Sequence, residues 1–262
     1  MKKFFLKTTF WLSTLIFLSL INKPCNANNV RNLIIYAEPN LFVTLTKIAR
    51  IYSQNYAVNV AVNFNSSLDF INEIDSGEPA DIFISAHPIL AETLRQKGLI
   101  DVYNIGYIAN DDLVLATSKN NSQISPKLLK KNITLEEAIL TLNENKNNLI
   151  IDNEGSSSGV FAKNFLQNFT LENISIFTKL YEDRNSLNYD LKNDASSYAI
   201  LFESQIRKNQ DLQIIARKKD KNIFYRALVI AGDNMDVARE FLKFLKKPLA
   251  QKIFKENNFV IN

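Results

Sequence analysis

Apolar and polar residues follow recognisable periods along the first third of the chain, beginning near Asn32. Short continuous apolar runs indicate buried strands, and apolar residues three or four positions apart indicate helices between them. Proline, serine and glycine residues mark the ends of these segments. The pattern predicts strands over 32–37, 58–64 and 80–86, and helices over 39–52, 66–77 and 88–97. This strand–helix order, repeated three times, predicts parallel strands with right-handed crossovers.

A second run of the same kind begins near Leu113 and continues to the C-terminus. No linker rich in proline or glycine separates it from the first run. The sequence therefore predicts an α/β fold of two lobes that are joined by strands crossing between them. The second run predicts strands over 113–117, 149–151, 197–202, 213–216 and 228–231, and helices over 134–143, 160–169, 237–245 and 248–259.

The first 27 residues have the pattern of a secretory signal peptide. Lysines come first, an apolar stretch over 10–21 follows, and Cys25-Asn26-Ala27 places small residues before a cut after Ala27. An uncleaved anchor is the alternative, although the apolar stretch is short for a membrane span. Lys23 and Pro24 argue against lipidation of Cys25. We expect export to the periplasm.

Loss of this segment changes the charge and the available chemistry. It holds four lysines and no acidic residue, so the mature chain has as many acidic as basic residues. This balance gives no support to nucleic-acid binding. The single cysteine is also lost, which excludes a disulfide, a thiol nucleophile and a cysteine metal site. His87 is the only histidine, so a histidine-rich metal site is excluded.

The loop Gly155-Ser156-Ser157-Ser158-Gly159 lies between a predicted strand and a predicted helix. It meets the G-x-S-x-G pattern of a nucleophile elbow, with Ser157 as the nucleophile. That triad order needs a histidine after the serine, and the only one precedes it. A phosphate-binding P-loop lacks its lysine and its glycine spacing.

A simpler interpretation is that this loop binds an anion, because that requires neither a histidine nor a lysine. A helix N-terminus offers free N–H groups and a partial positive charge, and hydroxyl side chains add donors. Similar strand-to-helix junctions occur at 64–67 and 37–40. Serines at any one junction could simply cap the helix. Three junctions that face one cleft could hold an oxyanion without a cationic side chain.

The run Pro79-Ala80-Asp81-Ile82-Phe83-Ile84-Ser85-Ala86 resembles the P-A-D-[VL]-F-I-S-A-D signature of the molybdate-binding proteins of bacterial ABC importers. Residues 33–41 are similar to the opening strand and A-A-S-L turn of that family. Residues 64–77 match its F-x-x-S-x-x-L-x-x-Q-I-x-x-G spacing, and 241–259 resemble its closing helices. The resemblance covers nearly the whole mature chain.

The resemblance implies a type II periplasmic binding protein fold, with two α/β lobes and a ligand cleft between them. Lobe one would comprise 28–110 plus 227–262, and lobe two would comprise 111–226. The implied function is that of a solute-binding protein, not an enzyme, that delivers a tetrahedral oxyanion such as molybdate or tungstate to a membrane permease and its ATPase. It implies a monomer without a cofactor, in which neutral hydrogen bonds hold molybdate as an oxyanion and no protein side chain binds a metal.

The ligand positions of the family carry over to five residues. Its first serine corresponds to Asn40 and its second to Ser67. Its two backbone donors correspond to Ser158 and Arg184. The tyrosine whose hydroxyl contacts the oxyanion corresponds to Phe202, which has no hydroxyl. A hydrogen bond to a charged partner contributes about 1.5–3 kcal/mol, so this loss could weaken binding tenfold or more.

Several alternatives stay open. A guanidinium at Arg184 could replace the lost hydroxyl and favour phosphate, sulfate or an organic anion, or Arg184 could pair with Glu182 or Asp183 at the rim. Phe202 would otherwise be a core aromatic, and His87 a residue at a helix start or at the surface. A secreted serine hydrolase that uses Ser157, and a receptor for a protein partner, are the other function classes.

Overall fold

The structure is a computed structural model of the chain, and it describes residues 30–179, 184–194, 196–206 and 211–261. The expected signal peptide over 1–27 lies outside these residues. Contacts group the described residues from Arg31 onward into one compact unit. Among the residues that are described, no helix is long and apolar enough to cross a membrane.

The strands form one mixed sheet in the order β2-β1-β3-β8-β4-β7-β5-β6. Parallel pairing joins β1 to β2 and β3, and it joins β5 to β6 and β7. These pairs confirm the parallel strands that the alternating pattern predicts. The strands are β1 (Arg31–Ala37), β2 (Val58–Phe64), β3 (Ile82–Ser85), β4 (Ile100–Ser118), β5 (Asn148–Asp152), β6 (Ser175–Lys179), β7 (Ser197–Phe202) and β8 (Leu212–Ile230).

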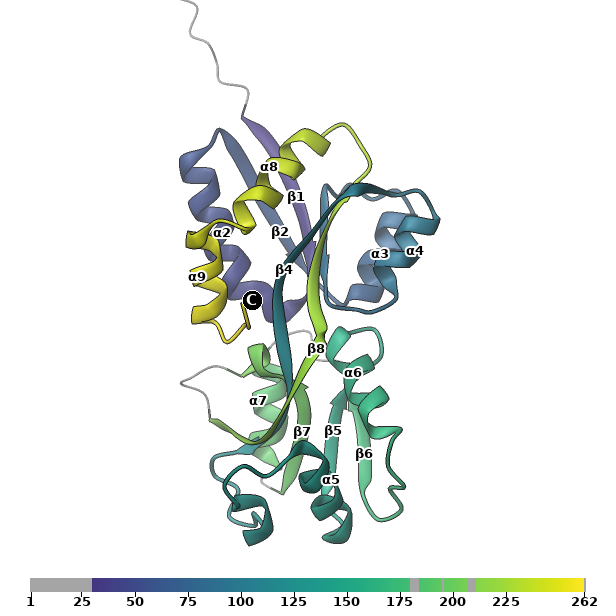
Figure 1. Cartoon of the computed structure of the whole chain (residues 1–262), viewed down its shortest axis with the longest axis vertical. Coiled ribbons are helices and arrows are strands. Elements are labelled where there is room, and N and C mark those ends of the chain that lie inside the picture. The colour runs from purple at the N-terminus through teal and green to yellow at the C-terminus, as the bar shows by residue number, and fades with distance from the viewer. Residues whose placement is uncertain (1–29, 180–183, 195, 207–210, 262) are drawn as a thin grey trace, which may run out of the picture. The chain divides into compact units, whose positions relative to one another are not determined.

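Helices connect most of these strands, and two of them close the chain (Figure 1). Within the described ranges, three short 3-10 helices lie among them: η1 (Pro39–Leu41), η2 (Pro126–Leu129) and η3 (Glu203–Gln205). The α-helices are α2 (Phe42–Asn55), α3 (Ser67–Asp75), α4 (Leu90–Gln96), α5 (Leu135–Glu144), α6 (Ser157–Leu166), α7 (Arg184–Asn193), α8 (Met235–Leu245) and α9 (Pro248–Glu256).

Two long strands, β4 and β8, run antiparallel side by side through the middle of the sheet (Figure 1). β8 also pairs with β3, and β4 also pairs with β7, both in antiparallel register. The sequence pattern predicts only short strands over 113–117, 213–216 and 228–231, so the structure corrects their length. The charged run 217–221 interrupts the apolar pattern of β8, although residues 217–219 within it pair with 112–114 of β4.

Two further elements carry no sequence signal. All five residues of β6 are exposed, so the strand has no buried face to reveal it. Helix α7 is rich in asparagine and charged residues, and its two leucines are too few to mark out an apolar stripe. Helix α6 also begins three residues earlier than the predicted range of 160–169, because Ser156 caps it.

Both faces of β1 are covered, which explains its nearly continuous apolar sequence. Leu33 and Ile35 belong to a core with α2, α8 and α9, whereas Ile34 and Tyr36 face the cluster formed with α3 and α4. Figure 1 shows these two groups of helices on opposite sides of β1. The two layers fix the carboxyl ends of β1, β2 and β3, where the candidate site lies.

Candidate functional site

A buried glutamate, Glu38, lies at the centre of the candidate site, with an exposed fraction of only 4%. It follows directly after β1 and precedes η1. Its Oε1 atom accepts hydrogen bonds from the Oγ atoms of Ser67 and Ser85, both at 2.6 Å. The Ser157 hydroxyl also donates to Oε1, and the Ala86 N–H donates at 3.2 Å. Four donors from three separate parts of the chain thus converge on one carboxylate oxygen.

Each donor lies at the carboxyl end of a strand, the edge at which open α/β sheets bind their ligands. Ser67 is the first residue of α3, after β2, and Ser157 is the first residue of α6, after β5. The residues just before them, Ser66 and Ser156, cap the two helices by accepting from backbone N–H groups of the first turn. Because capping falls to these neighbours, the hydroxyls of Ser67 and Ser157 can point at Glu38.

The loop before α6 touches the segment 66–87 directly. The Leu68 N–H donates to the Gly155 carbonyl oxygen at 3.1 Å, and the Oγ atoms of Ser85 and Ser157 lie 3.4 Å apart. His87 Nε2 lies 3.4 Å from the Glu154 carbonyl oxygen. The candidate site is therefore built from two stretches of chain that are about 70 residues apart in sequence.

His87 is buried beside this cluster, so the prediction of a surface position is wrong. Its Nδ1 atom accepts from the Ile89 N–H at 3.4 Å, just before α4 begins, as expected for a residue near a helix start. Burial lowers the pKa of the His87 imidazole, against smaller opposing effects of Glu38 and the Glu154 carbonyl. The ring is therefore neutral at pH 7, and both of its nitrogens contact groups other than Ser157.

Gly159 is required by a close backbone approach at the start of α6. A Cβ atom at this position would lie 2.0 Å from the Asn153 carbonyl oxygen and 2.5 Å from that of Asp152. No side chain fits there without a shift of the backbone. The second glycine of the G-x-S-x-G pattern thus serves the packing of α6 on the end of β5.

The serine-rich loop divides its hydroxyls among three tasks. Ser156 caps α6, Ser157 donates to Glu38, and the Ser158 hydroxyl donates to Asp152 Oδ2 at 2.5 Å. Of the predicted ligand residues, Ser67 lies in the Glu38 cluster. Ser158 lies next to it, in the first turn of α6, and its role as a backbone donor to a ligand stays a prediction.

Asn40 lies in a second polar network, next to the first. Its side-chain amide donates to Ser204 Oγ at 2.8 Å and to the Tyr225 hydroxyl. The Tyr225 hydroxyl in turn lies 3.3 Å from Asp111 Oδ2. The donors of Asn40, which the resemblance assigns to the oxyanion, are thus directed at Ser204 and Tyr225.

Asp111 is fully buried in this second network. Burial raises the pKa of its carboxyl to about 7, although the hydrogen bonds from Ser204 and from the Asp112 N–H act in the opposite direction. The group is therefore partly protonated at neutral pH, and its charge changes in the physiological range.

Replacement of Asp111 by asparagine is expected to remove a pH dependence of stability. An acid whose pKa is higher in the folded state stabilises the fold below its unfolded pKa of about 3.9, and this contribution is lost as the pH rises to about 7. Relative to Asp111→Asn, the native chain should lose on the order of 3 kcal/mol between pH 5 and pH 8. Urea unfolding of both proteins at the two pH values measures this. Asp233→Asn, at an exposed position, serves as the control. If the free energies of unfolding of the native chain and of Asp111→Asn differ by the same amount at both pH values, the prediction is contradicted.

The remaining two predicted ligand residues lie differently. Phe202 is fully buried at the end of β7, with its ring 5.9 Å from that of Phe161 and 6.4 Å from that of Tyr225. It is a core aromatic, and the hydroxyl of the neighbouring Tyr225 belongs to the network of Asn40 and Asp111. Arg184 begins α7, but its side chain lies outside the described residues, as do Glu182 and Asp183.

Sequence reasoning missed Glu38 and Ser85 as members of the site. Ser85 stands inside the recognisable I-S-A block, and Glu38 occupies an alanine position of the A-A-S-L turn when that turn is aligned on Asn40 and Leu41. A charged residue in place of a small apolar one, within the strand-to-helix junction 37–40, was the available signal.

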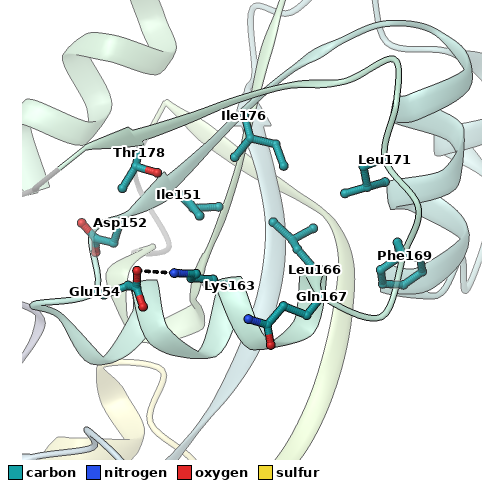
Figure 2. Close-up of a pocket in the computed structure, with 10 residues that line it drawn as sticks. All are labelled: Ile151, Asp152, Glu154, Lys163, Leu166, Gln167, Phe169, Leu171, Ile176 and Thr178. Carbon is teal, nitrogen blue, oxygen red and sulfur yellow. Dashed lines mark hydrogen bonds and ion pairs between the residues drawn. The ribbon is translucent and has the colours of Figure 1, made fainter.

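An open pocket of about 400 Å³ lies along α6 and the strands β5 and β6 (Figure 2). Figure 2 shows an ion pair between Glu154 and Lys163 at one end and apolar side chains, among them Leu166 and Phe169, toward the other. None of the donors to Glu38 lines this pocket. Within the described parts of the chain, no group of three or more histidine, cysteine or acidic residues could hold a metal ion.

Curated relatives and solved structures resemble the chain over most of its length. A molybdate-binding protein of Escherichia coli is 26% identical over 234 residues, which are 87% of this chain and 88% of that protein. The periplasmic molybdate-binding protein of Azotobacter vinelandii superposes with a TM-score of 0.61 at 18% identity, covering 88% of this chain and 99% of that one. A tungstate ABC transporter structure from Geobacter sulfurreducens gives a TM-score of 0.69 at 14% identity, covering 86% and 98%.

These likenesses identify the fold as that of type II periplasmic binding proteins, as the sequence resemblance predicts. All three relatives are named as binding or transport proteins, in agreement with the expectation that this chain is not an enzyme. The family model described as "Bacterial extracellular solute-binding protein" matches residues 33–260. The chain therefore belongs to the family of bacterial extracellular solute-binding proteins, and two of its curated relatives are named as molybdate-binding proteins.

Proposed function

We propose that this chain is the exported solute-binding protein of an ABC importer and that it binds a tetrahedral oxyanion, molybdate or tungstate first, at the Glu38 cluster. The observation that carries the proposal is the convergence of three serine hydroxyls and one backbone N–H on a single anionic oxygen. An oxyanion oxygen accepts the same hydrogen bonds as a carboxylate oxygen. A donor set that fits one therefore suits the other.

The electrostatic setting supports an anion as well. Ser67 and Ser157 each begin a helix, α3 and α6, and the partial positive charge of a helix N-terminus favours negative groups. Among the described residues, no group of three or more histidine, cysteine or acidic side chains could hold a metal ion at this site. The site would thus recognise the anion by oriented neutral donors, without a cofactor.

The two-lobe division expected from sequence gives the transport mechanism. Glu38, Ser67 and Ser85 would belong to the first lobe (28–110 plus 227–262), and Ser157 to the second (111–226). Contacts that the solute makes to both lobes would stabilise a closed state, because a ligand shifts an equilibrium only by its difference in affinity for the two states. After signal cleavage, the closed monomer would deliver its solute to the permease at the periplasmic face of the membrane, and the ATPase would drive its uptake.

Phosphate is a second candidate solute, and Glu38 is the observation that favours it. Sulfate, molybdate and tungstate carry no proton at neutral pH, whereas hydrogen phosphate carries one that a carboxylate can accept. A buried carboxylate within the donor set would then be a partner for the ligand and not an obstacle to it.

Calorimetric titration of the mature chain (28–262), refolded to remove bound solute, tests the proposed function. Molybdate, tungstate, sulfate and phosphate are compared at one pH and ionic strength. We expect saturable binding of molybdate and tungstate, with sulfate weaker. Preference for phosphate would move the assignment to the second candidate, and the absence of heat with all four anions would contradict oxyanion binding.

A further inference from the structure

We propose that Glu38 is an internal competitor for the solute: its carboxylate occupies the donor set of the site, and a bound oxyanion must displace it. This inference rests on the proposed function and adds a residue that sets the affinity. It starts from the fact that Glu38 belongs to the chain itself and already takes the hydrogen bonds that an oxyanion needs.

Glu38 and the solute compete because each serine hydroxyl has only one proton to donate. A serine hydroxyl donates only one hydrogen bond. While Ser67, Ser85 and Ser157 donate to Glu38 Oε1, none of the three has a proton left for a solute oxygen. The Ala86 N–H, at 3.2 Å, is directed at the same atom. A solute that binds at this cluster therefore needs Glu38 to move away.

Charge prevents the two anions from sharing the cluster. Like charges a few ångströms apart in a buried place repel strongly, because water screens them poorly there. Glu38 is 4% exposed, and it takes part in none of the ion pairs that the described residues form. No ion pair of Glu38 within the described residues offsets this repulsion, so we expect Glu38 and an oxyanion to exclude each other from the cluster.

A tethered competitor lowers the affinity by a predictable route. The apparent dissociation constant equals the intrinsic one divided by the fraction of molecules whose site is free. A group held beside its site on a short link acts at a high effective concentration. If Glu38 occupies the donors in nine molecules of ten, binding weakens about tenfold. The same contacts keep buried hydroxyls paired when no solute is present.

The carboxylate also joins the two stretches of chain that form the site. It contacts Ser67 and Ser85 on one stretch and Ser157 on the other. A bound oxyanion would bridge the same residues. Glu38 thus holds the ligand-free chain in the arrangement that the solute would otherwise stabilise. It thereby reduces the additional stability that the chain gains when the solute binds.

The test compares the native chain with Glu38→Ala and Glu38→Gln, each as the mature protein titrated with molybdate, tungstate and phosphate. Glu38→Ala removes the competitor, and molybdate should bind at least tenfold more tightly than to the native chain. Glu38→Gln keeps the shape without the charge, so its gain should be smaller, about threefold or more. Glu172→Ala, which removes an exposed carboxylate elsewhere, should bind as the native chain does.

The outcomes separate this inference from the proposed function. If the native chain binds an oxyanion and Glu38→Ala binds it equally or more weakly, the oxyanion site stands and Glu38 is not a competitor. Weaker phosphate binding in Glu38→Ala would make Glu38 an acceptor for the ligand, which also overturns the inference. If neither protein binds any of the anions, the proposed function fails together with it. Should Glu38→Ala fail to fold, as judged by circular dichroism, Glu38→Gln decides by the same comparison.

Discussion

Replacing Ser67 and Ser157 together by alanine, in a chain that also carries Glu38→Ala, is expected to abolish measurable oxyanion binding. Each hydroxyl that donates to a charged partner contributes about 1.5–3 kcal/mol, so two should cost about two to four orders of magnitude in affinity. The Glu38→Ala background matters because the same serines hold Glu38 in the native chain. Their loss there would weaken the competitor as well as the solute and so conceal part of the effect.

Calorimetry with molybdate measures this loss, and an exposed serine provides the control. Ser122→Ala in the same background changes one hydroxyl at the surface and should leave the affinity within twofold. Circular dichroism and thermal unfolding establish that the double serine variant is folded. An affinity of that variant within threefold of its parent would remove both hydroxyls from the solute site.

Gly159→Ala is expected to destabilise the fold by about 3 kcal/mol, at the upper end for an overpacked position. The added Cβ would lie 2.0 Å from the Asn153 carbonyl oxygen, a backbone atom that cannot yield by a rotamer change. Either α6 must move away from the end of β5, or the loop over 153–156 must rearrange. Both would also displace Ser157 from Glu38.

Urea unfolding, followed by circular dichroism, measures the stability of this variant. Gly232→Ala is the matched control, because a Cβ there meets no heavy atom within 4 Å. We expect that control to stay within about 0.5 kcal/mol of the native chain. A Gly159→Ala protein of native stability would show that the close approach at α6 is relieved at little cost, and it would weaken the packing explanation for the second glycine.

The sequence predicts those elements whose own residues carry the pattern. Strand β1 and helix α5 are examples: the apolar run 32–37 lies in a strand covered on both faces, and Thr134 forms a capping box with Glu137 at the predicted helix start. Strand β6 pairs with β5 at the edge of the sheet, and because all of its side chains are exposed it has no buried face that would predict a strand. The continuity of β4 and β8 likewise comes from their mutual pairing, which no local window contains.

The candidate site is predictable to a similar extent. The three strand-to-helix junctions and Ser67 follow from the local pattern and the family resemblance, because capping residues mark the start of a helix in the sequence. The choice between Ser157 and Ser158 is not, since neighbours on a helix point about 100° apart and only the fold says which one faces Glu38. The role of Glu38 depends on three distant hydroxyls that meet only in the folded chain.

A crystal structure of the native mature chain grown with tungstate tests the central claim most directly, because tungsten scatters anomalously and its position can be found without bias. We predict an anomalous peak within hydrogen-bonding reach of the Ser67, Ser85 and Ser157 hydroxyls, with the Glu38 carboxylate turned away from them. A peak elsewhere in the chain, or Glu38 still bonded to all three serines in a tungstate-loaded protein, would contradict the account.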